Sequence, residues 1–426
     1  MRNKIRSYIF LLVLLVSCLY VPAQTDINSP YSAFGIGDLY GNRSAYYLSQ
    51  GGISMGLSNS RYINFTNPAS YHGFDSTSFI FEGGLIGDYV SARTASATAH
   101  SQTMQLGYLL MGFPVNKWWN ASLGLTPYSS LGYLIYDEEV LDNIGLVNYI
   151  YEGYGGLNQA YFGSSFTFFD KLSLGFNAAY LFGALNYDRI VDFPDSLHIS
   201  SFRLGNNIIV RDFLFTLGLQ YTGKLNNNIN ITIGGVFNNT TDLKATTDLL
   251  GVSYFVGNDN VDFVKDTVVF LKDEAGNLKY PMGYGAGIAI EDTDHWLVGA
   301  DYQFQQWSNF TSFGISDSLA NSMRISIGGY FKPQASGIEK YWEKIQYRFG
   351  FRYQKTFLTL RNNQINEFGV TFGVGLPLRG NKSTFNLAFE AGQGGTTNNG
   401  LIKESFFRFT LGIAIYERWF IKRKFY

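Results

Sequence analysis

Ser405-Phe-Phe-Arg-Phe-Thr-Leu-Gly-Ile-Ala-Ile415, close to the end of the chain, decides the fold. In an extended strand, alternate side chains point to opposite faces. One face of this stretch is then uniformly apolar, and it consists of Phe407, Phe409, Leu411, Ile413 and Ile415. The other face is small or polar and includes Arg408. About ten such residues, tilted, cross the hydrocarbon of a bilayer. The stretch therefore predicts the closing strand of a transmembrane β-barrel, and the chain ends soon afterwards on two aromatics, Phe425 and Tyr426.

The composition fits the same class of protein. Of 426 residues, only 15% are charged, 17% are aromatic, and 47 are glycine. A mean hydropathy of −0.03 is too polar for a bundle of membrane helices, but a barrel wall that alternates apolar and polar residues gives such an average. The net charge of −1 points to no nucleic-acid partner. No linker or shift in composition divides the chain into separate domains.

Residues 1–23 have the features of a signal peptide. Arg2, Lys4 and Arg6 form a basic start, an apolar run follows from Ile9 to about Val21, and Val21-Pro22-Ala23 offers small residues for cleavage before Gln24. The alternative is lipidation of Cys18, because Leu15-Val16-Ser17-Cys18 resembles a lipobox. However, the apolar run continues past Cys18, which is the only cysteine. Export without another run long enough for a membrane helix predicts a barrel in the outer membrane of a Gram-negative bacterium.

Alternation of apolar and polar residues predicts about fourteen strands within residues 73–426, which we expect to form one barrel. The predicted strands are 77–92, 101–113, 119–135, 148–168, 172–188, 208–222, 229–242, 280–290, 296–308, 322–332, 345–358, 366–377, 384–392 and 405–418. Short connections alternate with long ones, which we expect at 136–147, 189–207, 243–279, 309–321 and 393–404. Short periplasmic turns and long outer loops are typical of such barrels. An even strand number then leaves both termini in the periplasm, and Glu339–Lys344 is expected to be a short periplasmic helix. The alternative fold is a soluble β-sandwich or propeller.

Residues 24–72 are predicted to form a plug, or hatch, inside the barrel. This segment is rich in Gly, Ser and Asn and shows no sustained alternation, yet it contains eight aromatic residues. Such a sequence is too apolar for a solvated tail, and the lumen would shelter its aromatic rings. The alternative is a partly ordered periplasmic arm that binds a partner.

Several short motifs, in order along the chain, resemble the FadL-type (OMPP1/FadL/TodX) family of outer-membrane transport proteins. The first is Asn67-Pro68-Ala69, similar to an element that follows that family's plug. The others are Ser122-Leu-Gly-Leu-Thr-Pro127, Gly299-Ala-Asp-Tyr-Gln-Phe-Gln-Gln-Trp-Ser-Asn-Phe310 and Tyr347-Arg-Phe-Gly-Phe-Arg-Tyr353. The resemblance implies a fourteen-stranded barrel with a luminal hatch and passive uptake of hydrophobic molecules.

The two ends of the chain depart from the transporters of that family. The opening Ser29-Pro-Tyr-Ser-Ala-Phe-Gly-Ile-Gly-Asp-Leu39 is unlike the plug of fatty-acid importers, and it resembles a divergent, Bacteroidetes-like branch. The ending Trp419-Phe-Ile-Lys-Arg-Lys424 fits the same branch. Relatives there include barrels of protein-secretion and outer-membrane assembly machines, so the resemblance alone does not establish uptake.

No catalytic or metal-binding constellation emerges from the sequence, and no cofactor is expected. The four histidines, His72, His100, His198 and His295, have no metal-ligand spacing. Asp292-x-Asp294-His295 has the composition of a hairpin turn, and Asn258–Asp262 lacks the glycine and distal glutamate of an EF-hand loop. Gly283-x-Gly285-x-Gly287 begins a strand rather than a helix, so a Rossmann site is excluded. An outer-membrane enzyme is therefore the weakest of three functional hypotheses.

Charged residues in the predicted strands mark the lumen. The alternation directs Asp301, Arg324, Arg348, Arg352, Glu390 and Arg408 inward. A charge facing lipid at mid-depth costs roughly 2–4 kcal/mol, so inward placement is expected for any function. Since both signs are present, we expect an ion-pair network that fills the lumen and holds the plug. The alternative is a polar conduit or a ligand site in which Arg324, Arg348 or Arg352 meets a carboxylate.

Pro127 is the strongest candidate for a lateral gap in the barrel wall. Proline does not donate to a strand ladder, and here it lies within a predicted strand between Gly124 and Gly132. A broken ladder at this point predicts a lateral gap. In the family that the chain resembles, a kink in the third strand, which is the strand of Pro127 here, gives apolar ligands a path into the membrane. The alternative is that Pro127 sits in the outer part of the strand, above the lipid.

Two main functional hypotheses follow from these observations. The first is hatch-gated, passive uptake of a hydrophobic or amphipathic small molecule. The second is a non-transporting barrel subunit of an outer-membrane protein secretion or assembly complex. Under either hypothesis, outer-membrane lipid surrounds the barrel. An open apolar pocket beside the plug favours uptake, whereas a lumen filled by ion pairs and a large exposed apolar surface favour the subunit.

Overall fold

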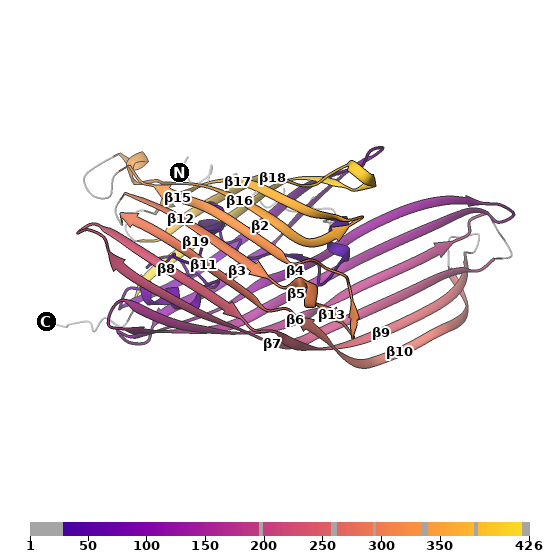
Figure 1. Ribbon diagram of the computed structural model, residues 1–426, viewed down its shortest axis with the longest axis horizontal. Helices are drawn as coiled ribbons and strands as arrows, with labels where there is room; N and C mark the ends of the chain where they lie inside the picture. The colour runs from indigo at the N-terminus through magenta and orange to yellow at the C-terminus, as the bar shows by residue number, and fades with distance from the viewer. Residues whose placement is uncertain are drawn as a thin grey trace, which may run out of the picture.

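The computed structural model describes residues 29–195, 199–256, 262–292, 295–333, 340–378 and 382–419. They form a closed antiparallel barrel of 14 strands, as predicted (Figure 1). The barrel strands are β2 (Ser78–Arg93), β3 (Thr98–Pro114), β4 (Trp119–Leu141), β5 (Gly145–Phe168), β6 (Leu172–Asp192), β7 (Ser201–Lys224), β8 (Ile229–Asn238), β11 (Gly283–Asp292), β12 (Trp296–Gln305), β15 (Ser322–Phe331), β16 (Gln346–Leu360), β17 (Asn363–Pro377), β18 (Thr384–Gly395) and β19 (Lys403–Arg418). Each predicted strand overlaps one of them.

The last strand closes the barrel against the first. β19 pairs with β2 along its whole length, from Lys403 opposite Arg93 to Arg418 opposite Ser78. Its side chains alternate as predicted: Phe407 and Ile413 are exposed on the outer surface, whereas Thr410 and Ala414 are buried on the inner side. The outer rows are apolar because lipid is their solvent, and the inner rows are small or polar because they meet other parts of the chain.

Three of the predicted long loops are wrong, because the chain there continues as strand. The ends of β4 and β5 replace the loop at 136–147, the ends of β6 and β7 replace most of 189–207, and β9 (Thr241–Val256) and β10 (Asp262–Tyr280) replace 243–279. β9 pairs with β7 and with β10. Because much of this region is open to solvent on both faces, no apolar–polar alternation marks it in the sequence.

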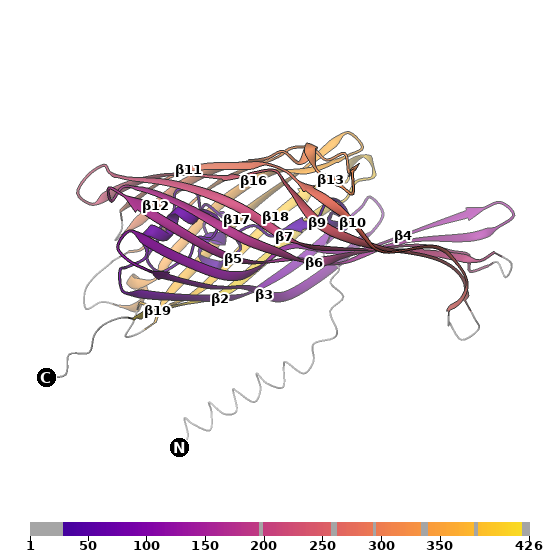
Figure 2. The same ribbon diagram turned by 90° about the horizontal axis from the view of Figure 1, so that it is seen from below.

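These strands form a sheet that projects from one end of the barrel, which we call the projecting sheet. Its order is β4-β5-β6-β7-β9-β10, and both views show it extending well beyond the remaining strands (Figures 1 and 2). The opposite end of the barrel has the short turns, such as 115–118, 169–171 and 225–228. There, η5 (Tyr341–Lys344) lies within the predicted short helix. Among the residues described, no helix is long and apolar enough to cross a membrane.

Residues 29–77, which we call the inner segment, lie within the barrel (Figure 2). They form η2 (Pro30–Ala33), β1 (Asp38–Leu39), α2 (Ala45–Leu48) and η3 (Pro68–Gly73). α2 contacts β17, β18 and β19, whereas η3 contacts β4, β5, β6 and β7 on the other side of the barrel. Ser29 donates from its backbone N–H to Gly132 O in β4. The chain before Ser29, which includes the predicted cleavage site and Cys18, lies outside the described residues, as do His198, Asp294 and the final aromatics.

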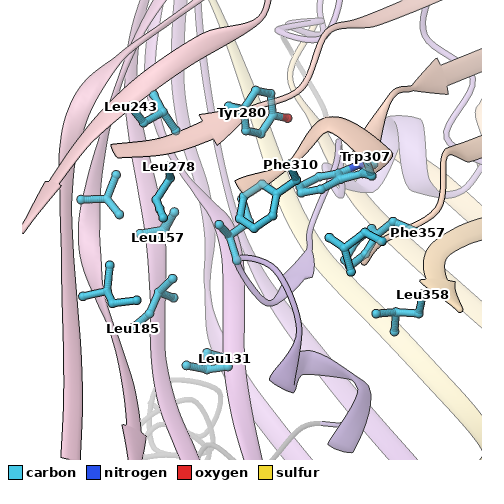
Figure 3. Packing of buried hydrophobic residues seen from close by; sticks show 14 of the residues in the cluster. Leu131, Leu157, Leu185, Leu243, Leu278, Tyr280, Trp307, Phe310, Phe357 and Leu358 are labelled. Carbon is cyan, nitrogen blue, oxygen red and sulfur yellow. The ribbon is translucent and has the colours of Figure 1, made fainter. Parts of the chain in front are cut away.

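An apolar cluster occupies the lumen where the projecting sheet joins the barrel (Figure 3). Trp307, in η4 (Trp307–Asn309), is fully buried and stacks on Phe357 with ring centroids 4.6 Å apart. Leu131 and Leu157, from β4 and β5, are also fully buried. The Trp-Ser-Asn-Phe stretch that was notable in the sequence therefore packs the core at this end.

Candidate functional site in the lumen

All six charged residues predicted to face the lumen lie on the inner side of the wall. Arg348 and Glu390 are fully buried, Asp301 and Arg352 nearly so, and Arg408 and Arg324 are partly covered. The structure brings three of them, Arg352, Glu390 and Arg408, into one network, and it places the others at separate contacts with the inner segment.

Strand register builds the network. Glu390 of β18 lies opposite Arg408 of β19, and Arg408 lies opposite Asp88 of β2. Three adjacent strands therefore present a row of alternating charge on one face, the arrangement that stabilises cross-strand pairs. Arg408 lies 3.5 Å from Glu390 and 3.3 Å from Asp88.

Neighbouring charges complete the network and balance it. Arg352 of β16 pairs with both Glu390 and Glu367, Glu367 also lies 3.0 Å from Arg408, and Arg43 of the inner segment lies 2.9 Å from Asp88. The three carboxylates, Asp88, Glu367 and Glu390, thus face the three guanidinium groups of Arg43, Arg352 and Arg408. This balance satisfies the charges within the protein, which buried ions require, and it agrees with the predicted ion-pair network.

Arg348 is held by neutral partners. Its guanidinium donates to Asn386 Oδ1 at 2.9 Å, to Gln346 Oε1 at 2.7 Å and to the Tyr62 hydroxyl at 3.1 Å. It also lies 4.6 Å from the centre of the Tyr46 ring, a cation–π contact. These bonds use the donors that a ligand carboxylate would need, so Arg348 fastens the inner segment to the wall.

Asp301 and Arg324 bind the backbone of the inner segment. Asp301 Oδ2 accepts from the N–H groups of Ser54 at 2.5 Å and Met55 at 2.9 Å. Arg324 donates to Gly51 O at 3.3 Å. Both contacts satisfy backbone groups that are shielded from water.

Asn67-Pro68-Ala69 forms the start of η3. The Asn67 side chain accepts from Ala69 N–H at 3.1 Å, as an N-cap does, and it donates to Met55 O at 2.8 Å. Ser173 of β6 donates to Ala69 O at 2.7 Å. Gly175 is required beside this turn, since a Cβ there would lie 2.4 Å from Ala69 N. The motif therefore positions the last turn of the inner segment against the wall.

Pro127 lies just beyond the point where the pairing between β3 and β4 ends. The β3–β4 ladder ends at Leu109 opposite Leu125, and the β4–β5 register shifts between Pro127 and Ser129. Gly124 lies within the ladder opposite Leu110, whereas Gly132 lies beyond it. Past the proline, β1 pairs with β4 at Ser129 and Ser130.

A cavity of about 430 Å³ lies at this break, and Pro127, Tyr40, Ser130 and Gly156 are among its lining residues. The inner segment therefore runs along the free side of β4 where β3 has separated from it.

A second cavity, of about 270 Å³, separates the inner segment from the wall. Phe65, Tyr128 and Phe357 contribute apolar surface, and Asn42 and Arg324 contribute polar surface. Asn42 Nδ2 and Asn238 Oδ1 border it and have no hydrogen-bond partner among the described residues. Its volume is below that of most pockets for drug-sized ligands, so it fits a small molecule rather than a long acyl chain.

Sequence reasoning missed Arg43, Asp88 and Glu367 of the network, and it missed Glu82, a buried carboxylate of β2 that accepts from the Ile63 N–H of the inner segment. The same alternation finds three of them, because Glu82 and Asp88 share the inward face of β2 and Glu367 shares a face with Gly369. Arg43 lies in the inner segment, where no periodicity exists to place it. Among the residues that the structure covers, no cluster of His, Cys, Asp and Glu is suited to a metal.

The closed barrel with a chain segment in its lumen defines the class of protein: a barrel with the fold of the FadL-type outer-membrane channels. The structure is similar to a Pseudomonas aeruginosa FadL homologue, with a TM-score of 0.61, 11% identity, and coverage of 90% of this chain and 99% of that one. It is also similar to the Pseudomonas putida toluene transporter TodX (0.58, 19%, 90% and 100%) and to the Ralstonia pickettii toluene transporter TbuX (0.57, 14%, 87% and 97%).

The particular family comes from sequence. The BamG family model matches residues 4–426, so the chain belongs to the BamG family. No match was found among curated protein sequences.

Proposed function

We propose that this protein is a barrel subunit of an outer-membrane protein assembly complex, in which it serves as a docking element rather than as a conduit. The observation that supports this role is the filled lumen. Arg348, Asp301 and the balanced ion-pair network all bind the inner segment or one another. The apolar cluster around Trp307 fills the lumen at the end that bears the projecting sheet.

Two further features support the proposal. Membership of the BamG family favours an assembly role over uptake. The projecting sheet also exposes large apolar side chains on strands that extend beyond the barrel, among them Val140 and Phe270. Large apolar side chains that are exposed to solvent are a feature of surfaces that contact other proteins. In the orientation we propose, with the short turns in the periplasm, the projecting sheet lies outside the cell. The Bacteroidetes-like branch is part of the same proposal.

Purification of the native protein in mild detergent tests this function. We expect other outer-membrane proteins to co-purify in fixed stoichiometry. A barrel that purifies alone, with lipid bound in its lumen, would overturn the assignment.

Uptake of a small hydrophobic molecule is the second candidate, because the 270 Å³ cavity and the break at Pro127 lie next to each other. Pro127 and Tyr128 border the cavity, so a ligand there would be close to the place where the β3–β4 ladder ends. On this account, displacement of the inner segment is the gating step. If it is correct, Pro127→Val restores a ladder donor, narrows the break and lowers uptake of toluene into liposomes that contain the protein. Leu134→Val, farther along β4, is the matched control, and unchanged uptake in Pro127→Val would count against this candidate.

A further inference from the structure

The free edge of β4 in the projecting sheet has the features of a binding site for an extended polypeptide. Beyond the β1 pairing, β4 continues to Leu141 with β5 as its only strand neighbour in the described residues. Its register with β5 is regular from Ser129 to Leu141. The other side of this stretch therefore presents unpaired backbone groups.

The inner segment shows which backbone groups face that side. Gly132 accepts from Ser29 N–H at 3.0 Å and donates to Ser32 Oγ at 3.1 Å, so its N–H and C=O point away from β5. In a regular strand every second residue repeats this direction. The backbone groups of Leu134, Tyr136 and Glu138 hence point to the free side as well, and the Glu138 N–H donates to the neighbouring Asp137 carboxylate at 3.1 Å rather than to a strand.

This edge lacks most devices with which proteins protect exposed strands. Edge strands commonly carry lysine, proline or bulges that discourage pairing. β10, the opposite edge of the projecting sheet, has Lys265 and Lys272 and three register shifts. β4 has neither lysine nor register shift between Leu131 and Leu141, and Tyr136 and Val140 are exposed beside its free groups.

The negative charge of the β4–β5 hairpin indicates which kind of partner strand it would bind. The β4–β5 hairpin, residues 119–168, contains no Lys, Arg or His, and its acidic residues are Asp137, Glu138, Glu139, Asp142 and Glu152. A second copy of the same edge would oppose carboxylate to carboxylate, which destabilises a strand pair. A lysine- or arginine-rich strand would instead place opposite charges across the seam.

We propose that residues 133–141 of β4 bind a basic, extended segment of a partner protein by β-strand addition, next to the place where the chain's own residues 29–40 already use this edge. Main-chain hydrogen bonds to Leu134, Tyr136 and Glu138 supply the affinity, and the acidic residues supply the selectivity. This inference rests on the proposed function, since it identifies the contact through which the subunit joins its complex.

A defined peptide tests the site on the intact, detergent-solubilised protein. The probe is a fluorescein-labelled nine-residue peptide of alternating lysine and valine, and binding is measured by anisotropy in a non-ionic detergent. Tyr136→Pro removes a donor on the free side only, whereas Tyr136→Val removes the same aromatic ring and keeps the donor. We expect the dissociation constant to be about fivefold higher for Tyr136→Pro than for Tyr136→Val, the effect of about one hydrogen bond.

A second comparison isolates charge. A triple variant should bind the basic peptide more weakly and with less dependence on salt concentration. It carries Asp137→Asn, Glu138→Gln and Glu139→Gln. Asp266→Asn, Asp273→Asn and Glu274→Gln on β10 serve as the matched control and should change neither. Any of three results would overturn the site. They are absence of peptide binding, equal dissociation constants for the two Tyr136 variants, and equal binding of a peptide of alternating glutamate and valine.

Purification of the native complex separates this inference from the proposed function. If wild-type protein co-purifies with partners and Tyr136→Pro retains them as well as Tyr136→Val does, the edge is not the contact but the subunit role stands. If wild-type protein purifies alone, the subunit role fails, whatever the peptide binds.

Discussion

The charged side chains in the lumen neutralise one another in ion pairs. Arg352 is the clearest case, since it bonds to Glu390 and Glu367 and is almost fully buried. Alternation predicted its inward direction from sequence. The sequence did not reveal which charges meet, because the contacts of Arg352 depend on the stagger between strands, and alternation does not specify stagger.

Replacing Arg352 should destabilise the barrel strongly. Arg352→Met leaves Glu367 and Glu390 to share Arg408, so the network keeps a negative charge without a counter-charge, and breaking a buried pair in this way costs about 3–5 kcal/mol. Arg203→Met, which breaks a solvent-exposed pair with Asp262, should cost less than about 1 kcal/mol. Urea unfolding of the two variants in detergent, followed by tryptophan fluorescence, provides the comparison. Similar losses would contradict the importance of the network.

His72 in η3 should make the inner segment sensitive to pH. Burial lowers the pKa of His72 below its usual 6.5, and its ring Nδ1 donates to Ala69 O at 2.8 Å. Because the pKa is lower in the folded state, the unfolded state takes up the proton first, so the folded turn loses stability as pH falls through about 6.5.

Hydrogen exchange of the amides of residues 67–74, corrected for intrinsic rates, should therefore speed up between pH 7.5 and 5.5 in the wild type. His72→Gln should remove this pH dependence. An equal acceleration in the variant would show that another group is responsible.

At the scale of elements, the sequence predicted the strands with one lipid-facing side and missed the strands that are exposed to solvent on both sides. The strand with Phe407 and Ile413 was recognisable because one face meets hydrocarbon. β10 was mistaken for a loop because residues on both of its faces are exposed, including the successive residues Phe263 and Val264. The lateral gap at Pro127 stays a prediction. The pairing of β1 with β4 beside it could not be predicted, since two-residue strands have no periodicity.

Glycines let the inner segment approach the wall. A Cβ on Gly350 of β16 would lie 2.1 Å from Gly51 N, in contact with backbone that has no room to move. Gly350→Ala should therefore displace α2 and its neighbours. Gly235→Ala is the control, because its nearest atom, Gly285 O, would lie 3.6 Å away.

Limited proteolysis should cut residues 29–77 faster in Gly350→Ala than in the control, while both barrels keep the heat-modifiable mobility of a folded barrel on gels. Equal cleavage rates would mean that the wall accommodates the methyl group.

At the scale of the molecule, closure of the barrel does not involve the tip of the projecting sheet. The barrel closes through β19 and β2, far from the β4–β5 tip. Tyr133 lies opposite Gly153, so replacing residues 134–152 with Asn-Gly should join the two strands through a two-residue turn. We expect a folded barrel in the outer membrane that has lost its co-purifying partners. Heat-modifiability on gels and pull-down of the tagged protein measure the two outcomes, and a variant that retains its partners would contradict a docking role for the tip.

The row of Glu390, Arg408 and Asp88 has a consequence for biogenesis. The three residues belong to the final hairpin and to the first strand, the seam that forms when the circle is completed. A slip of one position there would expose the arginine to acyl chains. A slip of two positions between β19 and β2 would keep every face correct and would still separate the arginine from Asp88. The ion pair across this seam therefore favours the native register of β19 and β2 over shifted registers when a newly inserted chain closes its barrel.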